Sequence, residues 1–272
     1  MSEQSVLTHG VLNRAESAHP ADVHADELRR EGFTLVPSGL APGELAALRD
    51  RLDDVYARQV AEAGGEESLA KCSDIDVARA PLAYDDAFIG VAANPNLLAV
   101  VERMLGENFV LMQQNGLLTR PATENYQVRW HRDLSYQHWV SSEPLAINAL
   151  LAVDEFTLQS GATFVLPASQ HRPEFPSEEY VSRHERVLEA PAGTFLVLDA
   201  MLFHRAGRNV SGAPRRAVNH LIGRPFLAQQ FDFASMAGDR YAGDPFLSRY
   251  LGYRWRPQPD VKSWRAQRMT TL

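Results

Sequence analysis

Cysteine is almost missing from this chain of 272 residues, in which Cys72 is the single example. An internal disulfide and a cysteine-rich zinc cluster are therefore excluded, and any bound metal must use histidine and carboxylate ligands. No stretch approaches the roughly 20 apolar residues of a transmembrane helix, and the polar first twenty residues lack the apolar run of a secretory signal. These absences predict a cytoplasmic protein that does not act in a membrane.

A basic surface is missing as well. The chain has 27 Lys and Arg against 34 Asp and Glu, which gives a formal net charge of −7, and it has no long basic run. Proteins that bind nucleic acids usually carry clustered positive charge, so this composition argues against a nucleic-acid partner. We expect a small-molecule substrate, and the sequence leaves the oligomeric state open.

The front of the chain, residues 1–107, contains mainly helical patterns. Apolar residues recur at helical spacing in three stretches, 25–32, 40–62 and 86–106. Residues 33–38 show a strand pattern between the first two stretches, and Gly106 is expected to cap the last helix. The front is therefore expected to be helical with one strand.

Residues 108–228 contain short strand patterns separated by turn residues. These patterns occupy 108–118, 126–131, 145–156, 161–169, 185–190, 193–203 and 215–223. Many short strands with few helices among them are typical of an antiparallel sandwich or barrel. No linker or repeat marks a boundary, so we expect one domain over 1–272, with its core in 108–228 and a C-terminal extension in 229–272.

The stretch "VRWHRDLSYQHW" places a histidine and an aspartate two positions apart. If "YQVRWHRD" ends a strand, alternation puts His131 and Asp133 on one side and Arg132 on the other. His204, which follows the apolar stretch "GTFLVLDAMLF", could supply a third ligand. Two histidines and one carboxylate leave coordination positions open for chemistry, whereas a structural zinc site normally has four protein ligands.

A short His-x-Asp pattern is weak by itself. His131 and His204 could instead be partly buried histidines that bond to nearby carboxylates. A zinc hydrolase would need a Glu or His base beside the metal, and none occurs at a suitable spacing. The sequence around these residues is therefore needed to distinguish a metal site from these alternatives.

Those surroundings resemble the phytanoyl-CoA dioxygenase family of iron(II)- and 2-oxoglutarate-dependent oxygenases. The resemblance rests on "WHRDLSYQHW", "SGATFVLPASQH" and "PAGTFLVLDAMLFHRAGRNVSGAPRRAV", and it extends weakly to the helical front. Ala168 and Ser160 stand where the family usually has Gly and often has Asn. Both are loop positions away from the three candidate ligands, so they do not put the chemistry in doubt.

The resemblance implies a mainly β fold with flanking α-helices, a double-stranded β-helix of the cupin-like jelly-roll type. It implies that His131, Asp133 and His204 bind Fe(2+), with 2-oxoglutarate as cosubstrate and O2 as oxidant. In this family an Arg eleven positions after the distal His binds the far carboxylate of 2-oxoglutarate, and Arg215 stands there. A planar guanidinium can hold a carboxylate through two parallel hydrogen bonds, and strand alternation turns Arg216 outward.

Further site residues follow less directly from the resemblance. Gln114, seven positions before Pro121, is expected to contact 2-oxoglutarate, although its neighbour Gln113 competes for the inner face. Asn219 should share the face of Arg215, with a buried structural amide as the alternative. Three residues follow the His-x-Asp pattern closely: Tyr136, His138 and Trp139. They could line the entrance to the substrate site, or they could be ordinary packing residues.

The implied reaction is hydroxylation of an unactivated C–H bond. Related halogenases replace the carboxylate ligand by a small residue, and this chain keeps Asp133. Desaturation, epimerisation and ring closure use the same centre and stay open. A non-enzymatic barrel that binds metal or ligand is the other alternative, but it would not need Arg215 together with three ligands. Because no basic cluster suggests a CoA phosphate site, we expect a natural product or a small amino-acid-like substrate.

Overall fold

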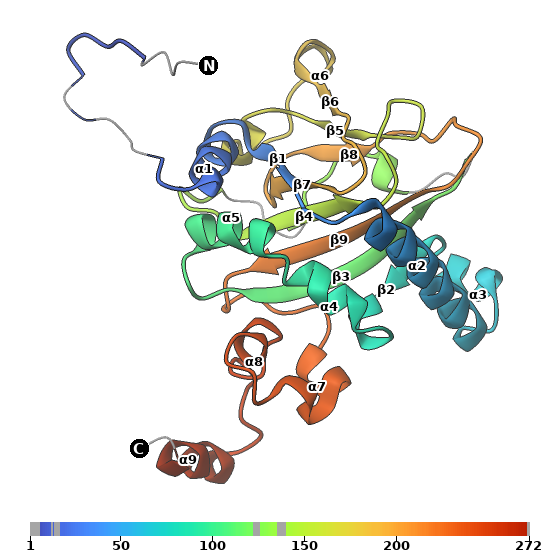
Figure 1. Cartoon of the computed structure of the whole chain (residues 1–272), viewed down its shortest axis with the longest axis vertical. Coiled ribbons are helices and arrows are strands. Elements are labelled where there is room, and N and C mark those ends of the chain that lie inside the picture. The colour runs from blue at the N-terminus through green and yellow to red at the C-terminus, as the bar shows by residue number, and fades with distance from the viewer. Residues whose placement is uncertain (1–5, 12, 14–16, 122–125, 135–139, 271–272) are drawn as a thin grey trace.

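Two antiparallel sheets form the centre of the protein (Figure 1). The computed structural model describes residues 6–11, 13, 17–121, 126–134 and 140–270. The larger sheet has six strands in the order β1-β7-β4-β9-β3-β2, and the smaller sheet has the order β6-β5-β8. Their bounds are β1 Phe33–Pro37, β2 Val77–Arg79, β3 Val110–Thr119, β4 Ala146–Ala152, β5 Thr163–Val165, β6 Arg186–Leu188, β7 Thr194–Asp199, β8 His204–Ala206 and β9 Arg215–Gly223.

The central strands of the large sheet are buried on both faces. Every residue of β4 and β7 is buried, which explains why these strands are almost continuously apolar instead of alternating. On one face Leu150, Leu196 and Ala217 pack with Val165 and Leu188 of the small sheet. The two sheets therefore face each other across an apolar layer, as in a jelly roll. The pairings among the described residues leave two sheets instead of one closed barrel.

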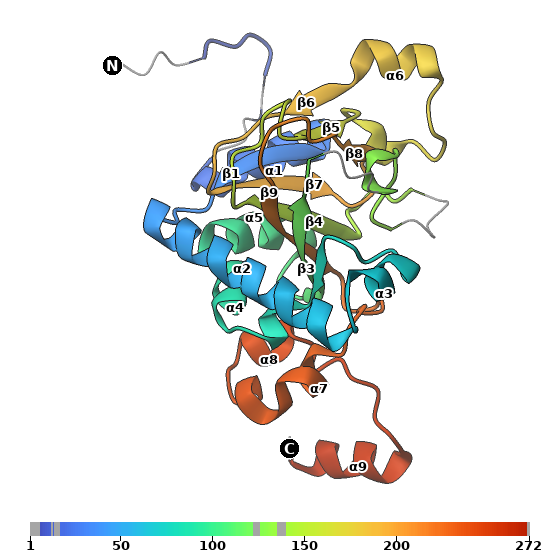
Figure 2. The same cartoon turned by 90° about the vertical axis from the view of Figure 1, so that its right-hand side faces the viewer.

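Helices cover the other face of the large sheet (Figure 2). These are α1 Pro20–Glu31, α2 Pro42–Glu62, α3 Glu66–Lys71, α4 Ala87–Ala92 and α5 Pro95–Leu105. The helix expected over 86–106 is in fact two helices, because Asn94 caps α5 through the amides of Asn96 and Leu97 and Pro95 begins it. Gly106, with φ 76°, ends α5 as predicted.

The helical front and the sheets share one hydrophobic core. Leu28, Leu52 and Val100 of the front are fully buried in the same cluster as Val218 and Ile222 of β9. The front also contributes β1 and β2 to the large sheet, one strand more than the sequence suggested. The fold is therefore mainly β with flanking helices, as predicted.

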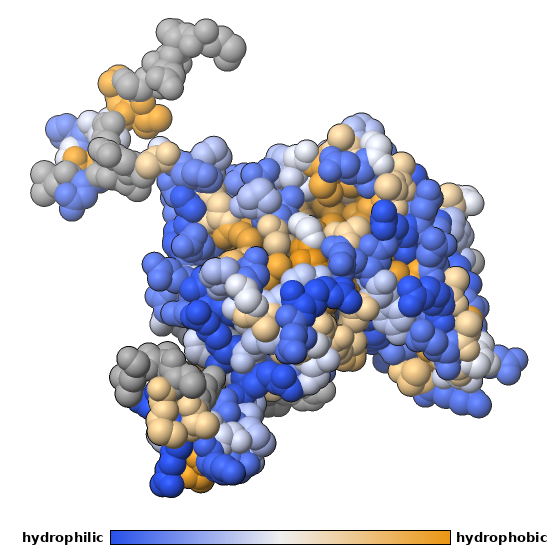
Figure 3. All heavy atoms as spheres, turned by 60° about the horizontal axis from the view of Figure 1, so that its bottom comes forward, coloured by the Kyte–Doolittle hydropathy of each residue, from blue (hydrophilic) through white to orange (hydrophobic). Residues whose placement is uncertain are grey.

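The C-terminal part continues beneath the sheet. It contains α7 Phe233–Ala237, η4 Gly238–Tyr241, α8 Leu247–Tyr250 and α9 Val261–Thr270. Phe233 and Tyr250 are buried in the main core, whereas α9 lies away from the body in both ribbon views. The face shown in Figure 3 is largely hydrophilic with a few apolar patches. Within the described ranges, no helix combines the length and apolarity required to cross a bilayer.

The remaining short elements lie in the segments that connect the strands and helices. They are η1 Pro81–Ala83, η2 Tyr126–Val128, η3 Ser169–His171 and α6 Glu178–His184. The strand expected over 126–131 is wrong, because η2 occupies its first half and a single bridge pairs His131 with His204. The chain reaches His131 from a turn, and its partner strand β8 begins at His204.

Candidate metal centre

The three residues singled out by the sequence come together at one end of the space between the sheets. One donor atom from each of His131, Asp133 and His204 lies within 4.8 Å of the others. The His131 and His204 backbones exchange two hydrogen bonds, with N···O distances of 2.9 and 3.0 Å, and their rings are 4.4 Å apart. The Asp133 amide donates to the carbonyl of Ala200 over 3.1 Å. Backbone pairing therefore aligns all three side chains before any ligand binds.

Each imidazole is oriented by its own backbone surroundings. Nδ1 of His131 lies 2.8 Å from the carbonyl oxygen of Arg129, and Nδ1 of His204 lies 3.0 Å from that of Leu202. A carbonyl can only accept, so Nδ1 carries a proton in both rings. Nε2 of His204 is 3.8 Å from Oδ1 of Asp133. In each ring Nε2 is therefore the nitrogen available to a metal.

The charge state also suits a metal site. Burial, and next the neighbouring His204, lowers the pKa of His131, so this ring is neutral at neutral pH. Two histidines with one carboxylate are the donor set of non-haem iron centres, in which the protein fills one face of the ion. The three residues could hold a divalent cation and leave positions for further ligands.

A pocket of about 50 Å³ opens beside the triad and is lined by both sheets. Arg215 and Asn219 from β9 line it together with Thr163 and the three triad residues. Asn219 therefore shares the pocket with Arg215, as strand alternation predicted. A larger cavity of about 160 Å³, around Asp199 and His171, contains none of the triad. Of these two cavities, the smaller one contains the three candidate metal ligands.

Arg215 is a buried cation without a carboxylate partner. Its side chain is 4% exposed, and it donates to the carbonyl of Gly161 and the hydroxyl of Thr119, both over 2.7 Å. Its Nε is buried and unpartnered, and its guanidinium lies 3.9 Å from the centre of the Phe156 ring. No ion pair joins Arg215 to a carboxylate within the described ranges. Burial lowers its pKa to about 10, so it stays charged at neutral pH.

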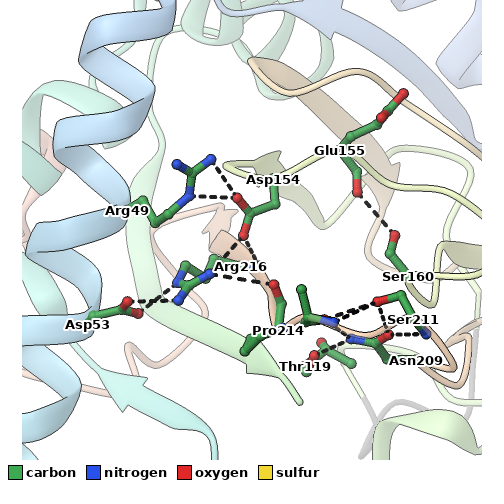
Figure 4. A network of polar contacts seen from close by, with 11 residues as sticks. Arg49, Asp53, Thr119, Asp154, Glu155, Ser160, Asn209, Ser211, Pro214 and Arg216 are labelled. Carbon is green, nitrogen blue, oxygen red and sulfur yellow. Dashed lines mark hydrogen bonds and ion pairs between the residues drawn. The ribbon is translucent and has the colours of Figure 1, made fainter. Parts of the chain in front are cut away.

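Arg216 points the other way, out of the sheet (Figure 4). Its Nε lies 2.7 Å from Asp53 and its Nη1 lies 3.3 Å from Asp154, which also pairs with Arg49 over 2.7 Å. These partners raise its pKa, the hydrogen bond to Asp53 most of all. Of the two adjacent arginines, only Arg215 faces the pocket, as predicted.

Two close loops hold Arg215 in place. Gly161, with φ +84°, offers its carbonyl to Arg215, and a Cβ at this position would lie 2.7 Å from the carbonyl of Gly207. Asn209 donates to the carbonyl of Thr119 over 2.6 Å and to that of Ala213 over 2.9 Å (Figure 4). Only glycine allows this approach, and the loops fix both acceptors of Arg215.

The expectation for Gln114 is wrong in its geometry. Gln114 is fully buried on the helix-covered face, where its amide accepts from the backbone of Leu82 and donates to the carbonyl of Phe88. It also lies 3.0 Å from Nε2 of His220, which bonds through Nδ1 to the carbonyl of Ala149. These contacts use the amide fully, so Gln114 cannot reach the pocket. Tyr136, His138 and Trp139 lie outside the described residues.

Asn148 is a site residue that sequence reasoning missed. It lies in the apolar strand β4 and donates from Nδ2 to Oδ2 of Asp133 over 2.6 Å. Its place as the only polar residue in "AINALLA" was a usable signal, because a buried amide in such a strand needs a partner.

Arg132 anchors the backbone between His131 and Asp133 from the opposite side. Its guanidinium donates to the carbonyls of Met201 at 2.7 Å, Ser169 at 3.2 Å, Pro173 at 3.3 Å and Arg172. It also stacks 3.8 Å from the centre of the Phe203 ring. This side chain ties the triad segment to two loops and has no role inside the pocket.

Replacing Arg132 with Leu should therefore lower the free energy of unfolding by about 3 kcal/mol, because several buried carbonyls lose a charged donor. Denaturant unfolding measures this difference. Arg183→Leu is the control, since Arg183 is exposed and pairs only with Glu179 on the same helix turn. Its effect should stay within about 0.5 kcal/mol. Equal stability of the two variants would show that the Arg132 contacts do not hold this segment.

Comparisons with known proteins agree with this centre. The family Phytanoyl-CoA dioxygenase (PhyH) matches residues 28–217. An uncharacterized protein of Mycobacterium tuberculosis is 34% identical over 231 residues, which cover 83% of this chain and 84% of the relative. The L-proline trans-4-hydroxylase of Streptomyces griseoviridis is 27% identical over 227 residues, which cover 70% of this chain and 81% of the hydroxylase.

Solved structures share the fold. The epimerase SnoN, in complex with Fe3+, alpha-ketoglutarate and nogalamycin RO, is 20% identical with a TM-score of 0.56 and covers 75% of this chain and 84% of its own. The non-heme monooxygenase ThoJ, as a nickel complex, is 19% identical with a TM-score of 0.59 and covers 76% of this chain and 80% of its own. The chain belongs to the phytanoyl-CoA dioxygenase (PhyH) family of iron- and 2-oxoglutarate-dependent oxidoreductases.

Proposed function

We propose that this protein hydroxylates an unactivated C–H bond of a small metabolite or natural-product intermediate. In this proposal His131, Asp133 and His204 hold the iron, and Arg215 binds 2-oxoglutarate. The observation that carries it is Arg215, a buried cation in the same pocket as the triad that has no carboxylate partner in the described part of the chain. A site that only bound metal would have no use for this cation.

The residues suit the groups they would hold. The triad has two oriented Nε2 atoms and a carboxylate, which is a donor set that iron(II) accepts. The buried and unpartnered Nε of Arg215 leaves room for a charge-assisted hydrogen bond to an anion. When bound, iron(II) supplies O2 activation coupled to the decarboxylation of 2-oxoglutarate to succinate and CO2.

The chain itself contributes position, charge and protection from water. Arg215 would orient the cosubstrate by its far carboxylate, while its own orientation is set by Gly161 and Thr119. Leu117, Leu150 and Leu198 line the same pocket and keep water away from the reacting atoms. Asn219 is proposed as a further polar contact in this pocket.

Hydroxylation is the reaction that the site supports best. Asp133 is present at the position where a halogenase would leave room for chloride, so the chain fits an oxygen-transferring enzyme. The similarity to an L-proline trans-4-hydroxylase favours a small amino-acid-like substrate. Epimerisation is the second candidate, because SnoN shares the fold and is an epimerase. The substrate mouth is proposed to include Tyr136, His138 and Trp139.

Labelled oxygen separates these reactions. The iron-loaded enzyme is incubated with 2-oxoglutarate, 18O2 and a panel of small amino acids that begins with L-proline, and products are analysed by mass spectrometry. Hydroxylation should place one labelled atom in succinate and the other in the product. A product of unchanged mass would indicate epimerisation, and a product that has lost two hydrogens would indicate desaturation or ring closure. Either outcome, or a chlorinated main product, would contradict the proposal.

A further inference from the structure

The carboxylate of Asp133 has two oxygens in different surroundings. Oδ2 accepts a hydrogen bond from Nδ2 of Asn148 over 2.6 Å. Oδ1 is the oxygen nearest the imidazole of His204, with 3.8 Å to its Nε2. The amide of Asn148 therefore binds the other oxygen, not the one recorded beside His204.

Asn148 is placed for this contact by the sheet. It lies in the middle of β4, opposite Leu198 of β7 and Leu221 of β9, and it is 4% exposed. Alternation puts its side chain on the same face as Leu150, toward the pocket. A strand between two hydrogen-bonded neighbours gives its Cα little freedom, so the position of the amide is rigidly defined.

The direction of the amide is also defined. A carboxylate only accepts, so the nitrogen end of Asn148 must face Asp133. The oxygen end is buried and has no hydrogen-bond partner among the described residues. Among the described residues, the amide nitrogen of Asn148 bonds to Asp133, whereas its amide oxygen has no partner.

We propose that Asn148 is a positioning residue that fixes the carboxylate of Asp133 so that Oδ1 alone is offered to the metal. The inference rests on the proposed role of Asp133 as a ligand. Within the described ranges, Asn148 is the only side chain that donates to Asp133, so its loss removes the one described contact that orients the carboxylate. A carboxylate that offers both oxygens takes up a coordination position that would otherwise stay open for the cosubstrate.

Metal binding to the iron-free protein, without 2-oxoglutarate, tests this role. Cobalt(II) is titrated by calorimetry, and its d–d absorption spectrum is recorded for wild type and Asn148→Leu. The variant should bind cobalt about 10 to 100 times more weakly, the usual effect of losing a partner that orients a ligand, and its spectrum should change. Asn148→Gln, which keeps the amide donor, should recover part of the affinity.

The matched control is Asn115→Leu. Asn115 is also a buried asparagine in a strand, 4% exposed, with an unpartnered amide oxygen, but it has no bond to Asp133. Its cobalt affinity should equal that of wild type. Denaturant unfolding of each variant shows whether a change in affinity reflects the site or the fold. If leucine prevents folding, Asn148→Ala removes the donor without added bulk and takes its place.

The outcomes separate this inference from the proposed function. If Asp133→Ala binds cobalt as wild type does, Asp133 is not a ligand, and the proposed function and this inference both fail. If Asp133→Ala loses cobalt while the folded Asn148 variants keep the wild-type affinity and spectrum, the metal site stands and the positioning role of Asn148 is wrong.

Discussion

Replacing Asp133 with Ala should abolish iron binding and 2-oxoglutarate turnover and leave the fold intact. Asp133 supplies the only carboxylate of the triad, and two neutral imidazoles alone hold a divalent cation weakly. We expect the affinity for iron(II) to fall by more than about a hundredfold, beyond the loss seen when a ligand's supporting partner is removed. His131→Ala and His204→Ala should behave alike. Succinate formation and the metal content after anaerobic loading measure the two effects.

The matched control for the histidine variants is His171→Ala. His171 is exposed and lies in the larger cavity, away from the triad. Its removal should leave metal content and turnover unchanged. Wild-type turnover by the Asp133→Ala protein, with no carboxylate added to the assay, would contradict the assignment of the ligands. Circular dichroism of each variant confirms that a lost activity is not a lost fold.

Replacing Arg215 with Ala should weaken 2-oxoglutarate binding by roughly two to three powers of ten. The far carboxylate of the cosubstrate would be left in a buried site without its counter-ion, which costs on the order of 3 to 5 kcal/mol. The measurement is the dissociation constant of 2-oxoglutarate for the metal-loaded protein under anaerobic conditions. Metal binding in the absence of 2-oxoglutarate should change little, because Arg215 donates its hydrogen bonds to Gly161 and Thr119, which are not triad residues.

Arg216→Ala is the adjacent control. Arg216 faces outward and pairs with Asp53 and Asp154, so its loss should affect stability without a comparable loss of cosubstrate affinity. If Arg216→Ala loses affinity for 2-oxoglutarate and Arg215→Ala binds it normally, Arg215 does not bind the cosubstrate. Asn219 would then lose its proposed role as well, because it lines the pocket through the same strand register.

Local geometry explains which parts of the site could be predicted. Adjacent residues of a strand face opposite sides, so the separation of Arg215 from Arg216 follows from the strand alone. The choice of Gln114 over Gln113 came instead from the spacing to Pro121 that the resemblance implies, and alternation from Leu117, which lines the pocket, places Gln114 on the opposite, helix-covered face.

Contacts between distant segments were not predictable. Arg132 reaches carbonyls of residues 169–173, and Asn148 reaches Asp133 from another strand; both depend on how loops and strands meet in space. The side-chain pattern of residues 126–131 is typical of a strand, but the structure has the 3-10 helix η2 at Tyr126–Val128. The split between α4 and α5 could have been read from Asn94 and Pro95, which are a helix cap and a first-turn proline.

The most direct test of the account is a crystal structure of the protein grown anaerobically with iron(II) and 2-oxoglutarate. We expect one iron bonded within about 2.2 Å to Nε2 of His131, Nε2 of His204 and Oδ1 of Asp133. The far carboxylate of 2-oxoglutarate should be paired with Arg215, and Asn148 should still donate to Oδ2 of Asp133. Iron bound at any other set of residues, or 2-oxoglutarate bound away from Arg215, would contradict it.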